Sequence, residues 1–264
     1  MSQAEQALKD GDPELALRLL QDQIRAKPAD AKLRVFLFQL LCVLGRWDRA
    51  LTQLNVAGEL DASTLAMVQT YREALQCERL RAQVFTGGKL PMLFGEPEPW
   101  TALLLEALLR EGRGEAEAAQ TLRTQAFEQA PACPGSADGQ PFEWIADADM
   151  RLGPLLEAVI NGRYYWVPLS HLSVLQLEAP SDLRDKVWLP AELKFRNGGE
   201  TVALIPSRYA DTDLSVADLA LARRTEWLEP RPGFFTGQGQ RLLATEAGDL
   251  ALLDLREITF TGEA

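Results

Sequence analysis

The sequence predicts an α+β protein, with tetratricopeptide-like helical repeats in the first half and a mainly antiparallel, β-rich second half. Small and apolar residues of the first half recur every 34 residues, which is the length of a tetratricopeptide helix–turn–helix unit. Proline, glycine and serine are concentrated at 131–141, as in connecting segments. Short aromatic and β-branched segments follow, and these are typical of strands. We therefore expect a helical domain at 1–130, a linker at 131–141 and a β-rich domain at 142–264.

The repeat consists of paired positions that are 34 residues apart: Gly11 and Gly45, Ala16 and Ala50, and Leu20 and Leu54. Glycine suits the turn between two helices, and the small alanine lets the paired helices approach closely. Ala118 and Leu122 lie 68 residues, or two repeat lengths, after Ala50 and Leu54. This spacing predicts a last unit in the same register. A generic helical bundle with coincidental spacing is the alternative.

Apolar periodicity and helix-capping residues predict the individual helices. The first helix of the second unit carries a broad apolar face between Leu33 and Leu44, and a long helix should cover 61–85. Val84 stands where the repeat would place an alanine, so this unit is irregular. A further helical pair is expected at 100–111 and 115–130, joined by the turn at 112–114.

In the second half, strands are expected at 163–167, 173–177, 186–189, 200–205 and 250–260. Asn161-Gly162 and Asn197-Gly198 favour tight hairpins, because both residue types tolerate a positive φ. Residues 213–224 should form a helix among these strands. Phe142, Trp144 and the aromatic residues of the expected strands should build the core of this domain, with one edge available to a protein partner.

The charge is strongly acidic, with 38 Asp and Glu against 27 Lys and Arg and a formal net charge of −11. Such a surface disfavours nucleic acid and anionic membranes. Residues 1–130 carry 15 basic and 18 acidic side chains, and residues 131–264 carry 12 and 20. The first twelve residues lack the features of a signal peptide, and the longest apolar segment, 35–44, is shorter than the about 20 residues that span a bilayer. We expect a cytoplasmic protein.

No motif for catalysis, cofactor binding or metal binding emerges. Three separated cysteines and one histidine exclude a histidine-rich metal site and a zinc-type cysteine motif. Gly87–Leu90 lacks the residues of a phosphate loop, and Gly237-Gln238-Gly239 lacks those of a dinucleotide site. We therefore expect no cofactor, no metal and no catalytic residue.

Two clusters deserve an alternative interpretation. Asp147 and Asp149 could serve a hydrolase of unrecognised type, although an acidic strand is the simpler interpretation. Ser170 and His171 are adjacent, and adjacent strand residues point to opposite faces, which disfavours a nucleophile–base pair. We expect His171 to be tied to a turn carbonyl, and Cys42 to be a buried filler of its apolar helix.

Four segments of the second half resemble the ImpE family, also called TagJ, of bacterial type VI secretion accessory proteins. These segments are Phe142–Pro154, Asn161–Pro168, Asp182–Trp188 and Ile205–Tyr209. The resemblance covers essentially the whole chain. It implies a cytoplasmic, non-enzymatic protein that binds the small sheath subunit TssB through a helix near the TssB N-terminus. It further implies a role around disassembly of the sheath by the ATPase ClpV, which this protein would contact at most indirectly.

The resemblance provides no residue-level binding motif, so the expected binding residues come from the repeat. A groove that holds a helix needs apolar anchors and a polar rim. Residues on the inner face of the first helices are the hypothesised partner-binding set: Lys32, Val35, Gln39, Gln69, Glu73 and Trp100. A strand edge or aromatic patch of the β-rich domain is the alternative surface. A general scaffold for another protein partner is the alternative function.

Overall fold

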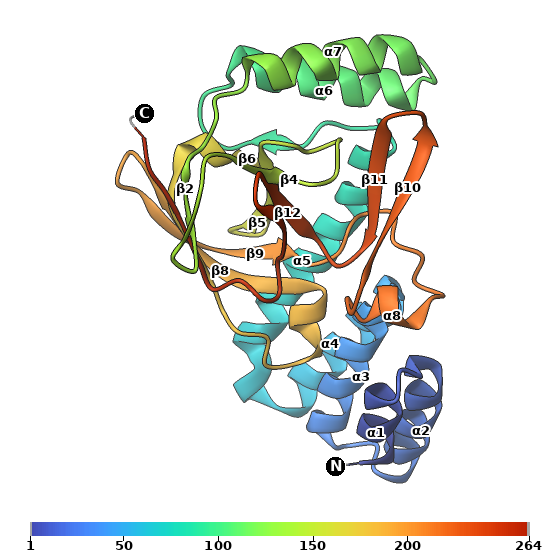
Figure 1. Cartoon of the computed structure of the whole chain (residues 1–264). Helices are drawn as coiled ribbons and strands as arrows, with labels where there is room; N and C mark the ends of the chain where they lie inside the picture. Colours follow the sequence, from blue (N-terminus) through green and yellow to red (C-terminus); the bar gives the residue numbers. More distant parts are fainter. Residues whose placement is uncertain (1, 263–264) are drawn as a thin grey trace.

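The computed structural model describes residues 2–262 and contains a stack of helices, a large sheet with two small ones, and a separate helical hairpin (Figure 1). The stack comprises α1 (Gln3–Lys9), α2 (Pro13–Ala26), α3 (Ala31–Val43), α4 (Trp47–Leu60), the short η1 (Ala62–Thr64) and α5 (Leu65–Phe85). The hairpin consists of α6 (Pro99–Gly112) and α7 (Ala116–Gln129). Among residues 2–262, no helix combines the length and apolarity needed to cross a membrane.

The stack has the predicted repeat. Ala16, Leu20, Ala50 and Leu54 are all completely buried, where α2 and α4 pack against their neighbours. Gly11 and Gly45 adopt φ values of +85° and +65° in the two turns, a conformation that favours glycine. Local capping defines the helix starts, because the side chains of Asp12 and Asp30 accept backbone N–H groups of α2 and α3.

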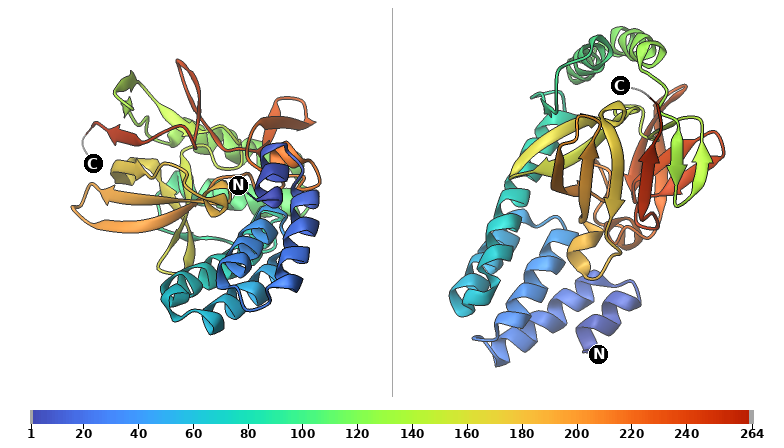
Figure 2. Two further views of the ribbon diagram at one scale, coloured as in Figure 1. Left: turned by 90° about the horizontal axis from the view of Figure 1, so that it is seen from below. Right: turned by 90° about the vertical axis from the view of Figure 1, so that its left-hand side faces the viewer.

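The α6–α7 hairpin lies on the other side of the β-rich domain from α1–α4, so the helical half is not one continuous stack (Figures 1 and 2). Both helices have nearly the predicted bounds. The predicted register of this last unit is wrong by one residue, because Ala119 is buried where Ala118 was expected, and Ala118 is exposed. The hairpin packs against the β-rich domain instead of extending the repeat.

The large sheet has nine strands in the order β1-β6-β5-β9-β8-β7-β14-β2-β3, all antiparallel except the β1–β6 pair. Its strands are β1 (Met92–Leu93), β2 (Gly135–Ala137), β3 (Gln140–Phe142), β5 (Leu155–Ile160), β6 (Arg163–Pro168), β7 (Leu172–Leu177), β8 (Trp188–Phe195), β9 (Glu200–Pro206) and β14 (Glu257–Phe260). The small sheets have the orders β13-β12-β4 and β10-β11. Their strands are β4 (Ile145–Asp147), β10 (Thr225–Arg231), β11 (Phe234–Gly239), β12 (Leu242–Thr245) and β13 (Gly248–Ala251). Three short helices complete the second half: η2 (Leu169–His171), η3 (Leu183–Lys186) and α8 (Ala217–Ala220).

Several local predictions for the second half are confirmed, and others are wrong. Asn161 and Gly162 both have a positive φ in the β5–β6 turn, whereas in the β8–β9 turn only Gly198 does. The strand expected at 250–260 is two strands, β13 and β14, separated by a turn. The helix expected at 213–224 is reduced to the four residues of α8. The segment expected as a linker contains β2 and two residues of β3, so it takes part in the large sheet.

The core has one layer on each face of the large sheet. Along β5, Leu155 and Val159 pack with the helices, whereas Leu156, Ala158 and Ile160 pack on the opposite face. This alternation follows the period of two of a strand. Strand β5 is buried at every position, although the sequence pattern did not predict it. It therefore has packed core on both of its faces.

Candidate functional site: a groove between the repeats and the second domain

A groove of about 690 Å³ lies on the helical stack. The lining includes Glu5 and Leu8 of α1, together with Lys32, Leu33, Val35, Phe36 and Gln39 of α3. The opposite wall comes from the second half of the chain, namely residues 180–183 and Lys186. The groove is therefore composite, with one side built by the repeats and the other by the connection between β7 and β8.

This second wall is firmly held. The Asp182 and Asp185 side chains form a reciprocal capping box at the start of η3, and the Ser207 hydroxyl donates to the Asp185 carbonyl at 2.6 Å. The Arg184 guanidinium lies over the Tyr71 ring of α5, 4.8 Å from its centroid. Because η3 is fixed to both α5 and the sheet, the groove exists before any partner arrives, which reduces the entropic cost of binding.

The groove combines an apolar floor with mixed charges at its rim. Leu33, Phe36 and Leu183 are partly buried hydrophobic residues that also pack on the core. Lys32 and Lys186 supply positive charge, and burial lowers the pKa of Lys186. Negative charge comes from the carboxylates of Glu5 and Asp182. An apolar floor with a polar rim suits the amphipathic helix of a partner.

The rest of the inner face is covered by the protein's own second domain. Tyr71 of α5 packs against Phe38 and Trp188, with ring centroids 5.8 Å apart in both pairs, and Trp188 also lies 5.9 Å from Trp47. The Trp188 indole donates to Glu78 Oε1 of α5 at 2.9 Å. The groove therefore lies along the portion of the inner face near α1 and residues 32–39 of α3.

The structure brings together three of the six hypothesised partner-binding residues. Lys32, Val35 and Gln39 line the groove. On α5, the Gln69 amide donates to Glu73 Oε1 at 2.6 Å, and the Glu73 side chain lies against Gly162 in the β5–β6 turn. Trp100 is far along the chain at the start of α6, is only 2% exposed and donates to Glu98 Oε2 at 2.9 Å. The six residues thus do not form one surface.

Sequence reasoning missed the wall formed by η3. The signal was the Asp182-Leu-Arg-Asp185 segment, in which two carboxylates three residues apart form a capping box. In the sequence analysis this segment contributes only to the family resemblance. That it faces α3 depends on how the β7–β8 connection folds back across the helices, which no local pattern encodes.

The two aspartates considered for hydrolysis belong to a buried network of charges. Asp147 receives hydrogen bonds from Arg241 and from the backbone of Asp149, and Asp149 pairs with Arg151 at 2.6 Å. Burial raises the pKa of Asp147 to about 7, although Arg241 acts in the opposite direction. Their carboxylates are thus engaged with arginines of the fold, which favours a structural interpretation of this motif.

His171 lies as expected beside a main-chain carbonyl. Its Nδ1 is 3.2 Å from the Phe94 oxygen, and its Nε2 is 3.0 Å from Glu98 Oε1. Ser170 also donates to Glu98, at 3.3 Å, and not to His171. All three cysteines are free and buried, and burial raises the pKa of the Cys77 and Cys133 thiols to about 12 and 11. Within the described part of the chain, no cluster of three His, Cys, Asp or Glu residues could hold a metal ion.

The chain is 55% identical over 258 residues to the type VI secretion system accessory component TagJ of Pseudomonas aeruginosa, and the match covers 97% of this chain and 90% of the relative. This chain belongs to the ImpE/TagJ family. The ImpE family model matches residues 139–259, and a tetratricopeptide repeat model matches residues 7–75. The crystal structure of protein VPA1032 from Vibrio parahaemolyticus superposes with a TM-score of 0.90 at 27% identity, covering 99% of this chain and 98% of that one.

These matches explain where the family features lie. The ImpE match contains Asp147, Asp149, Glu157 and Arg241, which are residues of the buried charge network, and also η3. The repeat match ends within α5, before Glu78 and Arg81. The predicted fold class is confirmed: the two matched regions correspond to the repeat stack and the β-rich part of this ImpE-family chain.

A second exposed apolar area lies on the β10–β11 ribbon, a separate two-stranded sheet that extends toward α6 and α7 (Figure 1). Trp227, Leu228 and Phe235 are each more than a third exposed, as is Trp144 before β4. Trp144 belongs to the aromatic set predicted from the sequence, whereas Trp227, Leu228 and Phe235 do not. Trp144 also lines a separate hollow of about 460 Å³.

Proposed function

We propose that this chain is a non-enzymatic adaptor of a type VI secretion system. In this role it acts in the cytoplasm, binds the N-terminal helix of the sheath subunit TssB and works around ClpV-dependent sheath disassembly. Membership in the ImpE family and the accessory role in the name of the Pseudomonas aeruginosa relative support the secretion-system assignment. The groove between α3 and η3 is the single observation that supports binding of a helix.

The size and chemistry of the groove support this partner class. An amphipathic helix presents apolar side chains at positions i, i+3, i+4 and i+7, and Leu33, Val35, Phe36 and Leu183 offer an apolar surface for them. The lysines and carboxylates at the rim can orient the polar flanks of that helix. The helix would contact both halves of the chain, because the groove has a wall from each.

Isothermal titration calorimetry of the full chain with a synthetic peptide of the TssB N-terminal helix tests the proposal. We expect micromolar or tighter binding. Val35→Asp, which places a charge in the groove, should weaken binding at least about tenfold because that charge loses hydration against apolar groups. Val202→Asp is the matched control, since Val202 is 73% exposed on β9 and outside the groove.

The result that would overturn the proposal is the absence of binding to both the peptide and intact TssB. If Val35→Asp still binds TssB as tightly as the unmodified chain, the contact lies outside the groove. Binding of TssB that is lost in Trp227→Ser but kept in Val35→Asp would assign it to the β10–β11 ribbon. A chain that binds another protein of the secretion system but not TssB would be a general scaffold of the tetratricopeptide-like type.

A further inference from the structure

A second cavity lies at one end of the large sheet, where several connections meet. Its volume is about 570 Å³, within the roughly 300–1,000 Å³ typical of small-molecule sites. Its walls come from the β1–α6 connection, the segment between α7 and β2, η2, the β8–β9 turn and the residues after β14. It shares no lining residue with the groove, and the proposed function does not use it.

Glu96 and Glu98 both line this cavity, and the Glu98 carboxylate is already hydrogen-bonded. Glu98 accepts hydrogen bonds from Ser170 Oγ at 3.3 Å and Trp100 Nε1 at 2.9 Å, and lies 3.0 Å from His171 Nε2. Both ring nitrogens of His171 face acceptors, since Nδ1 lies 3.2 Å from the Phe94 carbonyl oxygen. The carboxylate of Glu98 therefore has little capacity left to attract a cation or a further donor.

The basic side is positioned but incompletely used. Arg196 Nε donates to the Ser170 carbonyl at 2.7 Å, and Nη1 donates to the Gly262 carbonyl. These two bonds hold the guanidinium in place beside the cavity. Within residues 2–262, Nη2 of Arg196 has no hydrogen-bond partner, and Arg196 is one of the residues that line the cavity. A fixed guanidinium with free donors is suited to a carboxylate.

The remaining walls are apolar. Phe94 and Phe195 stack with ring centroids 4.5 Å apart and an interplanar angle of 13°. Pro131 and Pro134 line the cavity on the side of the α7–β2 connection. An aromatic or branched apolar group could pack against these rings while a charged group reaches Arg196. The combination of apolar walls and one oriented polar group is the usual composition of a small-ligand site.

We propose that this cavity binds a small organic carboxylate, with its carboxylate on Arg196 and its apolar body against Phe94, Phe195 and the two prolines. A free carboxylic acid and the C-terminal residue of a polypeptide share this chemistry. A polypeptide C-terminus carries an amide group next to its carboxylate, and a simple free acid does not. The proposal is independent of TssB binding and concerns a separate region of the surface.

The single histidine of the chain makes the test specific. His171 lies in the cavity, so the ring signals of a 13C,15N-histidine-labelled full chain report on this site alone. At constant pH, 3-phenylpropionate should shift these signals saturably, with a dissociation constant of about 1 mM. The neutral 3-phenylpropionamide should bind at least about tenfold more weakly, because it cannot form the charge-assisted bond. N-acetyl-L-phenylalanine identifies the source: tighter binding than 3-phenylpropionate indicates a polypeptide C-terminus, and weaker binding indicates a free acid.

Two variants and a matched control complete the experiment. Arg196→Gln should weaken binding of 3-phenylpropionate at least about tenfold, and Arg196→Lys, which keeps the charge, should weaken it less. Arg256→Gln should leave it unchanged, since Arg256 also donates to main-chain carbonyls but lies outside the cavity. The proposal is overturned by equal binding of the amide, by full binding in a folded Arg196→Gln chain, or by no saturable shift up to about 20 mM.

Discussion

Arg81 of α5 and Glu157 of β5 form a buried two-point ion pair, with distances of 2.6 Å from Nε to Oε1 and 3.0 Å from Nη2 to Oε2. Arg241, which precedes β12, donates to the same carboxylate and to Asp147. Burial works against the charge of Glu157, but Arg81 and Arg241 outweigh it and lower the pKa of Glu157 to about 2. One carboxylate thus joins the helical stack, the large sheet and a small sheet.

Removing that carboxylate should strongly destabilise the fold. Glu157→Gln keeps the shape of the side chain but removes the carboxylate that two buried guanidinium groups share, which leaves Arg81 paired only with Glu78 and Arg241 only with Asp147. We expect a loss of about 3–5 kcal/mol in the free energy of unfolding, measured by urea denaturation at pH 7. Arg25→Gln is the control, because Arg25 and Asp22 form an exposed pair and should change stability by less than about 0.5 kcal/mol. A loss below about 1 kcal/mol for Glu157→Gln would contradict this role of the ion pair.

The pH dependence of stability should reveal Asp147. Its pKa is about 7 in the folded protein and about 3.9 in an unfolded chain, so the folded state binds more protons between these values. Linkage then requires Asp147 to reduce stability as the pH rises from about 4 to 7. Asp147→Asn cannot titrate in this range. As the pH rises from about 4 to 7, its free energy of unfolding should therefore increase relative to that of the unmodified chain. Parallel stability curves between pH 4 and 7 would contradict the prediction.

Titration of Glu157 should have the opposite effect on the free energy of unfolding, and in a lower pH range. Because its folded pKa is depressed to about 2, its stabilisation is present above the unfolded value of about 4.3 and is lost as the pH falls toward 2. Acid unfolding of the unmodified chain should therefore steepen below pH 4. Glu157→Gln should remove part of that slope, as measured by denaturant titrations at several pH values. An identical slope in the variant would assign acid unfolding to other groups.

Binding of a partner helix in the groove should depend little on salt. Lys32 and Lys186 lie at the rim with Glu5 and Asp182, and Asp182 is itself paired with Arg184. The rim thus presents charges of both signs, so the binding free energy should come chiefly from apolar contacts. Salt screens exposed charges but does not weaken apolar contacts. We expect the Kd for the TssB peptide to change less than about threefold between 0.05 and 0.5 M NaCl. A change above about tenfold would indicate a predominantly electrostatic interface elsewhere.

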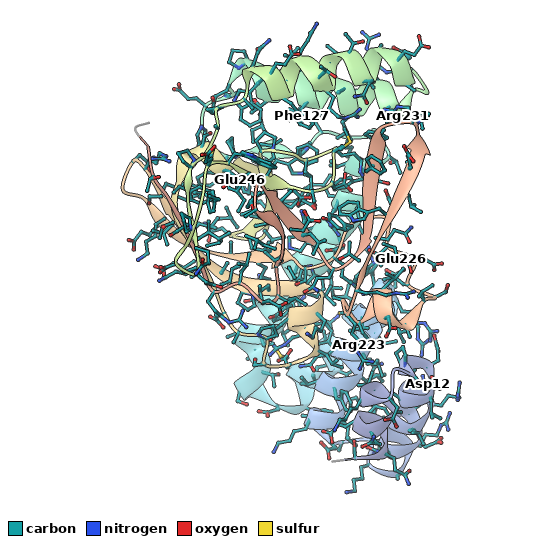
Figure 3. The ribbon with its side chains drawn as sticks, viewed as in Figure 1. Asp12, Phe127, Arg223, Glu226, Arg231 and Glu246 are labelled. Carbon is teal, nitrogen blue, oxygen red and sulfur yellow. The ribbon has the colours of Figure 1, made fainter. Side chains whose placement is uncertain are left out.

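The α6–α7 hairpin should depend on one aromatic ring. The Phe234 ring contacts both Arg123 and Arg231, whose guanidinium carbons are 4.3 and 3.9 Å from its centroid, and both arginines pair with Glu111 of α6. Figure 3 shows Arg231 at the ribbon end that faces this hairpin. Phe234→Ala should cost about 3–5 kcal/mol and increase amide hydrogen exchange in α6 and α7.

Phe235→Ala is the matched control for that experiment, because Phe235 is the next residue and is 41% exposed. It should leave exchange in α6 and α7 unchanged. If both variants behave alike, the ring of Phe234 does not hold the hairpin in place.

The repeat could be predicted because its determinants are local. Alanine and leucine at fixed spacing specify which helix faces pack, and Ala16 and Leu20 are indeed completely buried. Strand β5 could not be predicted in the same way, because both of its faces are covered and no alternation of polar residues remains. The one polar residue within it, Glu157, is buried by arginines that are 76 and 84 residues distant in the sequence.

The predicted binding residues show the same limit. Lys32, Val35 and Gln39 are on one helix, and periodicity correctly placed them on one face that lines the groove. Trp100 was assigned by extending the repeat across a stretch in which the chain leaves the stack and crosses the sheet. The outer wall at η3 depends on a contact between α3 and residues about 150 positions later, which one sequence alone does not reveal.

The shared ion pairs between α5 and the sheet constrain how family members can be recombined. Consider a chimera that joins residues 1–91 of one homologue to the remaining residues of another. Arg81 of the first segment would then require an acidic residue at the position of Glu157 in the second segment. A mismatch there would leave an uncompensated charge within the core, even if each parental segment came from a stable protein. The two halves are therefore expected to be inherited and exchanged together, and a productive crossover would have to lie outside the span that contains both residues.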